Sequence, residues 1–109
     1  LSTVLTTIHE QYREHLDQTA LARSVGMSAS AFSHAFRKYL NVPFSAYLNA
    51  YRISQVRREL IETEAPITEI AFRNGFNNLS HFNRQFLRQV GESPRAFRQR
   101  KHTLSPHST

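Results

Sequence analysis

The chain has 109 residues, which suits one compact unit or two very small ones that share a core. It contains no cysteine, so neither a disulfide framework nor a thiolate metal site is expected, and this suits a reducing cytoplasm. No apolar run approaches membrane-spanning length, so no membrane partner is expected. The net charge of +6, from 14 Lys and Arg against 8 Asp and Glu, favours a polyanionic partner.

Apolar residues recur at helical spacing along the first part of the chain, and no segment alternates like a strand. Residues 3–15 form the first expected helix. Asp17 is placed to cap a second helix that stops at Gly26, and Ser28 to cap a third that ends before Pro43. The apolar side chains of the third helix that are expected to face inward are Phe32, Ala35, Phe36 and Leu40.

A long helix is expected next, from Phe44 to about Thr63, with its apolar stripe at Phe44, Tyr47, Leu48, Tyr51 and Leu60. A fifth helix ends at the Gly75 turn, and a sixth follows that is capped by Asn77 or Asn78. Ser93-Pro94 starts a seventh helix, because serine caps well and proline is tolerated at the first helical position. Residues 102–109 are polar and are expected to be a flexible tail.

The chain also repeats itself. "LARSVGM" (21–27) lies over "IAFRNGF" (70–76) at an offset of 49, and "FSHAFRKYLNVPFSAYL" (32–48) lies over "FNRQFLRQVGESPRAFR" (82–98) at an offset of 50. The matched positions include an alanine, a glycine and a pair of phenylalanines in each copy. Two copies of one helical motif are therefore present.

The repeated alanine and glycine have separate mechanical roles. The small residue, Ala22 or Ala71, lets the following helix cross close by, and the glycine four positions later takes a positive-φ turn. Two helices joined in this way form a helix-turn-helix, whose second helix can enter the major groove of DNA. The duplication of this pattern in a basic chain favours a DNA-binding function.

The face opposite the phenylalanine pair of each second helix carries the candidate base readers. Their spacing of 0, 3 and 4 residues puts each set on one helical stripe. The candidates are Ser30, Ser33 and His34 in the first copy, and Ser80, Asn83 and Arg84 in the second. Arg84 can contact guanine and Asn83 adenine, whereas the first set is softer and suits contacts through water. An ordinary solvated helix face is the alternative interpretation.

A second group of residues is expected to contact phosphates, because charge draws such side chains to the DNA backbone. The cations of this group are Arg37, Lys38, Arg88, Arg95, Arg98, Arg100 and Lys101, and Asn78 is assigned to the same group. Three further arginines on the long helix are interpreted as packing or ion-pairing residues: Arg52, Arg57 and Arg58.

The length of the long helix also bears on DNA binding. About 18 residues span roughly 27 Å, slightly less than the roughly 34 Å between successive major-groove faces on one side of a duplex. We therefore expect either that the DNA bends or that one motif engages less fully.

These features together predict an all-α fold of seven helices, in which two helix-turn-helix subdomains are joined by a long linker helix. The expected boundaries are 1–43 for the first subdomain, 44–63 for the linker helix, 64–101 for the second subdomain and 102–109 for the tail.

The chain resembles the DNA-binding domain of the AraC/XylS family of bacterial transcription regulators over roughly residues 4–100. The family pattern I-x-x-I-A, G-F, F-x-x-x-F and G-x-S-P-x-x-[YF]-R runs through "ITEIAFRNGFNNLSHFNRQFLRQVGESPRAFR". Its base-contacting positions map to the six candidate base readers named above. The family usually has Lys or Arg where this chain has Leu87, and many relatives have Gly where it has Asn41.

The resemblance implies the wider function of the protein. It implies sequence-specific binding of double-stranded promoter or operator DNA in the bacterial cytoplasm, at the nucleoid, with RNA polymerase as a further partner. Most family members attach this domain behind an N-terminal effector-binding or dimerisation domain, so a longer effector-responsive regulator is expected, with any dimerisation through that missing domain.

An enzyme is not expected, because the sequence has no Gly-rich phosphate loop and no evident carboxylate pair in an apolar pocket. Neither a cofactor nor a metal is expected, since none of the six His falls in a metal-ligand pattern. The remaining alternative is a helical protein-interaction module whose basic face meets an acidic partner. Such a module would show no preference for one DNA sequence over another.

Overall fold

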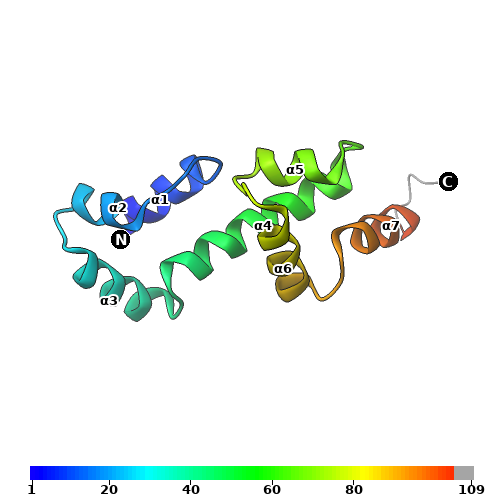
Figure 1. Cartoon of the computed structure of the whole chain (residues 1–109). Helices are drawn as coiled ribbons and strands as arrows, with labels where there is room; N and C mark the ends of the chain where they lie inside the picture. Colours follow the sequence, from blue (N-terminus) through cyan, green and yellow to red (C-terminus); the bar gives the residue numbers. More distant parts are fainter. Residues whose placement is uncertain (105–109) are drawn as a thin grey trace. The chain divides into compact units, whose positions relative to one another are not determined.

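A computed structural model describes residues 1–104 of the chain, and within them seven α-helices form (Figure 1). They are α1 (Ser2–Gln11), α2 (Gln18–Ser24), α3 (Ala29–Leu40), α4 (Phe44–Glu62), α5 (Ile67–Arg73), α6 (Leu79–Val90) and α7 (Pro94–Leu104). The expected all-α fold is confirmed over this part of the chain. In these residues, no helix is both long and apolar enough to cross a membrane.

The contacts divide the chain inside α4. The first unit is Leu1–Tyr51, and the second begins at Arg52. The sequence predicts a linker helix at residues 44–63 that is separate from both subdomains. In the structure α4 is one continuous helix, but its first half belongs to the core of one unit and its second half to the core of the other.

The first unit packs α1, α2 and α3 against the start of α4. Its buried residues are Val4, Ile8, Tyr12, Leu21, Ala22, Phe32, Phe36, Phe44 and Leu48. Phe44 from α4 meets both phenylalanines of α3 edge-on, with ring centroids 6.0 Å from Phe32 and 5.8 Å from Phe36. Edge-to-face pairs of this kind add to the burial energy of the rings, so α3 is held firmly by one of its faces.

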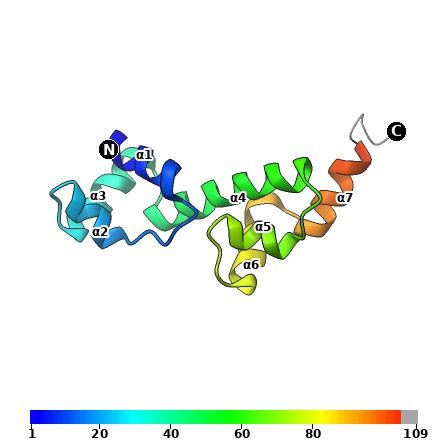
Figure 2. The ribbon, with the colours of Figure 1, turned by 90° about the horizontal axis from the view of Figure 1, so that it is seen from above.

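The second unit gathers α5, α6 and α7 around the end of α4 (Figures 1 and 2). Its buried residues are Ile53, Val56, Leu60, Ile70, Ala71, Phe76, Phe82, Phe86 and Phe97. The Phe86 ring lies 5.7 Å from that of Phe97, at an interplanar angle of 73°. The phenylalanine pair of α6 therefore plays the same anchoring part as the pair of α3.

A polar cluster also ties α5 to α4. Asn74 is fully buried, and its Nδ2 donates to Glu59 Oε2 at 2.5 Å and to the Ile70 carbonyl at 2.8 Å. The other Glu59 oxygen accepts from Arg73 Nε at 3.0 Å. The position that matches Asn74 in the first copy is Val25. Because a valine side chain cannot form hydrogen bonds, the first copy has no equivalent of this cluster at that position. A buried amide is costly unless it is hydrogen-bonded, and here it is.

The expected helix starts are confirmed by their caps. Asp17 Oδ1 accepts from the amide of Thr19, Ser28 Oγ from that of Ala31, and Ser93 Oγ from that of Ala96. The first helix, by contrast, ends at Gln11, four residues before the expected end, and the buried Tyr12 forms its C-cap.

The last helix runs further than the sequence predicts. α7 continues through His102 to Leu104, so the expected tail at residues 102–109 begins too early. The reason is a contact that fixes this turn, because His102 Nε2 donates to the Leu60 carbonyl at 3.1 Å. The rest of the expected tail, residues 105–109, lies outside the described residues.

Candidate nucleic-acid interface

The turn before α3 and the turn before α6 have the same construction. Gly26 and Gly75 both adopt positive φ, at +72° and +99°. In each turn the residue after the glycine donates its amide to the carbonyl of the buried alanine, Met27 to Ala22 at 2.9 Å and Phe76 to Ala71 at 3.1 Å. Because a side chain resists positive φ, glycine is suited to both turns, as the sequence predicts.

Each turn leads into a helix with one buried face and one exposed face. In α3 the phenylalanine pair is fully buried, and the candidate base readers Ser30, Ser33 and His34 are all exposed. Ser28 caps this helix, Ser30 lies in its first turn, and Ser33 and His34 lie one turn further on. The side chains can therefore reach a ligand that approaches the outer face of α3.

In α6 the same arrangement places Ser80, Asn83 and Arg84 on the exposed face. Within residues 1–104, no hydrogen bond or ion pair engages the side chains of Asn83 and Arg84. Both side chains thus keep their donors available for base edges. Leu87, one turn further on, is 56% exposed on this same face.

The candidate phosphate contacts divide into two groups. Four cations are exposed: Arg37 and Lys38 at the end of α3, Arg88 near the end of α6, and Arg95 in the first turn of α7. Lys38 Nζ lies 5.7 Å from the centre of the Tyr39 ring, which is itself 68% exposed. Three of these cations thus lie on the second helix of a motif, and Arg95 lies on the helix that follows the second motif.

Arg98 is the clear correction to the sequence-based assignment. Its Nε donates to the Leu60 carbonyl at 3.1 Å, its Nη1 to the Ala65 carbonyl at 2.7 Å, and its Nη2 to the Thr63 carbonyl at 3.1 Å. The guanidinium therefore binds carbonyls at and just beyond the end of α4, and three of its five N–H groups are engaged there. Arg98 holds the fold together and is withdrawn from the candidate interface.

Three more expected interface residues have partners within the protein. Asn78 Oδ1 accepts from the amide of His81 at 2.8 Å and caps α6, which decides between the two caps that the sequence allows. Arg100 pairs with Glu92, with Nε 3.0 Å from Oε2, and this hydrogen bond holds the pKa of the Glu92 carboxyl below its usual value. Lys101 Nζ lies 5.8 Å from the centre of the Phe97 ring.

The contacts of the three arginines on α4 agree with their interpretation, from the sequence, as packing or ion-pairing residues. Arg57 lies over the Phe97 ring at 5.6 Å, and Arg58 approaches Glu62 at 4.0 Å. Arg52 is half-buried, and this burial lowers the pKa of its guanidinium. None of these side chains belongs to the exposed faces of α3 or α6.

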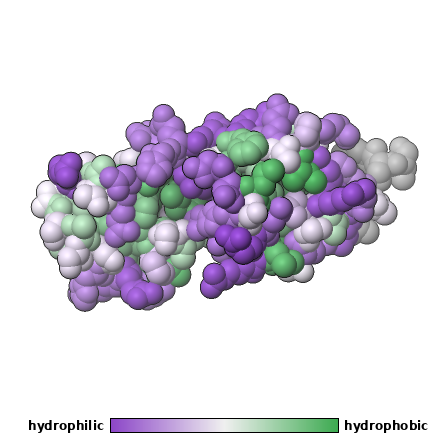
Figure 3. All heavy atoms as spheres, in the orientation of Figure 1, coloured by the Kyte–Doolittle hydropathy of each residue, from purple (hydrophilic) through white to green (hydrophobic). Residues whose placement is uncertain are grey.

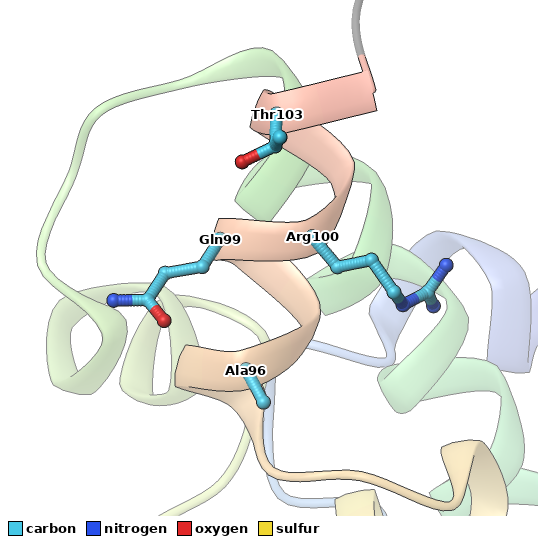
Figure 4. Close-up of a pocket in the computed structure, with 4 residues that line it drawn as sticks. All are labelled: Ala96, Gln99, Arg100 and Thr103. Atoms are coloured by element: carbon cyan, nitrogen blue, oxygen red, sulfur yellow. The ribbon is translucent and has the colours of Figure 1, made fainter.

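Outside these helix faces, the structure offers few features that suggest another site. On the face shown in Figure 3, hydrophilic residues predominate and hydrophobic ones form small patches between them. One hollow on α7 is lined by Ala96, Gln99, Arg100 and Thr103, with Gln99 and Arg100 on either side of Ala96 (Figure 4). In the described part of the chain, no three His, Cys, Asp or Glu side chains are grouped to hold a metal ion. The exposed faces of α3 and α6 are therefore the strongest candidate site.

Two motifs of this construction, each with a buried phenylalanine pair and an exposed polar face, define the helix-turn-helix class of protein. The comparisons with known proteins agree with this assignment. A family model described as a helix-turn-helix domain matches residues 21–100. The chain belongs to the AraC-type helix-turn-helix family of DNA-binding transcription regulators, and the resemblance noted from the sequence is confirmed.

Two curated relatives and one solved structure illustrate the likeness. The chain is 33% identical over 98 residues to an uncharacterized HTH-type transcriptional regulator of Staphylococcus aureus, covering 90% of this chain and 13% of the relative. It is 29% identical over 99 residues to the HTH-type transcriptional activator RhaS of Escherichia coli, covering 91% of this chain and 36% of RhaS. The DNA-binding domain of AdpA, solved in complex with a target DNA, matches with a TM-score of 0.88 and 27% identity, over 96% of this chain and 95% of that chain. The chain thus spans only a minor part of these curated relatives.

Proposed function

We propose that this chain binds double-stranded DNA in a sequence-specific manner, with α3 and α6 as its two recognition helices in neighbouring segments of the major groove. Ser30, Ser33 and His34 contact bases from α3, and Ser80, Asn83 and Arg84 contact bases from α6. The observation that carries the proposal is the repeated exposure of this stripe, opposite a buried phenylalanine pair, in both motifs. The AdpA complex with a target DNA supports it, because that domain has the same fold.

The phosphate contacts of the proposal are the four exposed cations: Arg37, Lys38, Arg88 and Arg95. They position the protein on the duplex without reading its sequence. Asn78 remains a candidate through its amide nitrogen alone, since its Oδ1 accepts from the backbone of α6.

The wider role follows from the relatives. We infer that the chain forms the DNA-binding part of a longer, effector-responsive bacterial regulator that works in the cytoplasm at promoter or operator DNA. RNA polymerase is the proposed protein partner, and any dimerisation is assigned to a domain outside this sequence. This proposal is supported by the fact that the chain covers only 13% and 36% of the lengths of the two curated relatives.

The proposal is tested by selecting bound duplexes from a random pool at near-physiological salt. A consensus site should emerge, and the protein should bind it at least 1000-fold more tightly than a scrambled duplex of equal length, as is typical of specific binders. Arg84→Ala should relax the preference at one base position, with a loss of about 1–3 kcal/mol on the selected site. Arg88→Ala should weaken the selected and scrambled duplexes alike.

Arg58→Ala is the matched control, because it removes the same charge from an exposed position on α4 that lies outside both recognition helices. It should leave the selected preference unchanged. If no consensus emerges, or if Arg84→Ala weakens selected and scrambled DNA equally, base reading by this face is wrong. A tight complex with an acidic protein, without any DNA preference, would favour a protein-interaction module instead.

A further inference from the structure

Leu87 stands in the middle of the exposed face of α6. At about 100° per residue, the directions of Asn83, Ser80 and Arg84 cover an arc of about 100°, and Leu87 falls within it. The side chain is 56% exposed and is not among the apolar residues packed against the core of the second unit. A large apolar side chain so placed contributes little to the fold and is available to a ligand of that face.

The internal repeat makes this position informative. The residue that matches Leu87 in α3 is Arg37, which is also exposed. Arginine carries five N–H donors and a positive charge, whereas leucine can neither donate nor accept a hydrogen bond. The two helices therefore offer opposite chemistries at the same place on the recognition face, and α6 presents an apolar group where α3 presents a cation.

The major groove contains one apolar group that distinguishes base pairs, the C5-methyl of thymine. The other groups on the base edges of the major groove are hydrogen-bond donors and acceptors. An apolar side chain that covers such a group removes it from water without giving it a new hydrogen bond, which costs free energy. Leu87 lies about 4.5–6 Å along the helix axis from Arg84 and Asn83, a distance of one or two base-pair steps.

We propose that Leu87 is a specificity-determining residue that contacts the 5-methyl group of a thymine, close to the base pairs read by Asn83 and Arg84. The second motif then selects thymine at one position through an apolar contact, in addition to its hydrogen bonds. This inference rests on the proposed DNA-reading function of α6, and it adds one defined base to the recognition site.

Deoxyuridine substitution tests the contact atom by atom, because it removes the methyl group and leaves the base pair intact. Each thymine of the selected duplex is replaced singly, and the Kd is measured by fluorescence anisotropy for the wild type and for Leu87→Ala. For the wild type, the Kd should rise about fourfold at one position, the value expected for losing one buried methyl-sized group. For Leu87→Ala, this rise should shrink to less than about twofold, because the smaller side chain no longer covers that methyl.

Two further variants serve as controls. Phe72→Ala removes another exposed apolar side chain, 52% exposed on α5, and should keep the fourfold deoxyuridine effect. Leu87→Arg copies the first motif and should lose the methyl effect while making binding more sensitive to salt. Circular dichroism should show the same helix content and melting temperature for Leu87→Ala as for the wild type, since the side chain is exposed.

The outcomes separate this inference from the function on which it rests. A protein that prefers its selected duplex but shows no deoxyuridine effect at any position, or the same effect in Leu87→Ala as in the wild type, overturns the role of Leu87 alone. A selected site without any thymine near the bases that depend on Arg84 has the same consequence. Failure to prefer any duplex overturns the DNA-reading function and this inference with it.

Discussion

Arg98 shows how a single charged side chain can complete a helix. The last carbonyls of a helix have no amide partner within it, and they need donors from elsewhere. Arg98 supplies three N–H groups to the carbonyls of Leu60, Thr63 and Ala65, around the end of α4. Its positive charge is also favourable near the negative end of the helix dipole. One side chain on α7 thereby fixes the path of the chain between α4 and α5.

We predict that Arg98→Ala lowers the free energy of unfolding by about 2–4 kcal/mol, because it leaves partly buried carbonyls without donors. Arg98→Lys should recover only a minor part, since an ammonium group cannot reproduce the planar fork of three donors. Urea unfolding followed by circular dichroism measures both. Arg95→Ala, an exposed arginine on the same helix, is the control and should stay within about 0.5 kcal/mol of the wild type. Equal stability of the two alanine variants would contradict the capping role.

The error in the sequence-based assignment of Arg98 has a physical cause. Its partners lie 33 to 38 residues away in the chain, so no local pattern announces them. Composition identifies a basic region, but it does not distinguish a cation that faces solvent from one that binds carbonyls of its own fold. Arg88 and Arg98 have the same charge, and only the structure separates their roles.

At the scale of single helices, α6 depends on Asn78 for its first turn. The side chain accepts the amide of His81, as Ser28 does for Ala31 at the start of α3. We predict that Asn78→Ala costs about 1 kcal/mol of unfolding free energy, the usual value of such a cap. Thermal unfolding measures the change. Asn78→Ser should retain most of the stability, because a serine hydroxyl accepts the same hydrogen bond.

Asn78→Asp separates the cap from a phosphate contact. Aspartate caps as well as asparagine, and its charge suits the positive end of the helix dipole, so the fold should keep its stability. Near a phosphate, however, the same charge would be repelled. Full stability together with DNA binding weakened on every sequence indicates that position 78 lies near the backbone. Full stability with unchanged binding would leave Asn78 as a cap only.

The ends of α3 and α6 show how far the repeat allows prediction. Gly91 takes the left-handed conformation after α6 at φ +90°, and Asn41 takes it after α3 at φ +63°. The sequence shows the mismatch of Asn with Gly, and the structure shows that both fulfil one backbone need, since asparagine is the residue other than glycine that caps helices in this way. The glycine turns and the serine caps are thus readable from sequence, whereas the equivalence of Asn41 with Gly91 is visible only in the structure.

The α4 helix shows where such prediction stops. The sequence predicts one apolar stripe, yet Ile53 and Val56, which that stripe omits, are buried in the second core. The reason is that α4 serves two cores in succession, and its buried face changes between Tyr51 and Arg52. A search for apolar residues at a spacing of 3.6 finds a buried face that stays constant along a helix. It cannot locate a change of buried face within the helix, because that change depends on which elements pack against each half.

The exposed faces of α3 and α6 were predictable in full, because the two buried phenylalanines of each helix determine which of its faces points into the core and which points to solvent. The six candidate base readers are all exposed, as that geometry requires. The phosphate set was only partly predictable. Exposure depends on tertiary contacts, and these engage Arg98 and Arg100 with partners in the protein and leave Arg88 and Arg95 in solvent.

For the whole molecule, charge predicts how binding depends on salt. Each phosphate neutralised by a cation releases condensed counterions, so the logarithm of the binding constant falls with the logarithm of salt concentration with a slope of about −0.9 per contact. Four phosphate-contacting cations give a slope of about −4. Removing one of them, in Arg88→Ala, should make the slope shallower by about 0.9 on selected and scrambled duplexes alike.

The comparison with Arg58→Ala makes this a test of position rather than of net charge. Both variants lower the net charge of +6 by one, but Arg58 lies on α4 beside Glu62, at 4.0 Å. Fluorescence anisotropy titrations from 50 to 300 mM salt should give the wild-type slope for Arg58→Ala and the shallower one for Arg88→Ala. Equal slopes for the two variants would mean that affinity follows the overall field of the basic chain and not a defined contact at the end of α6.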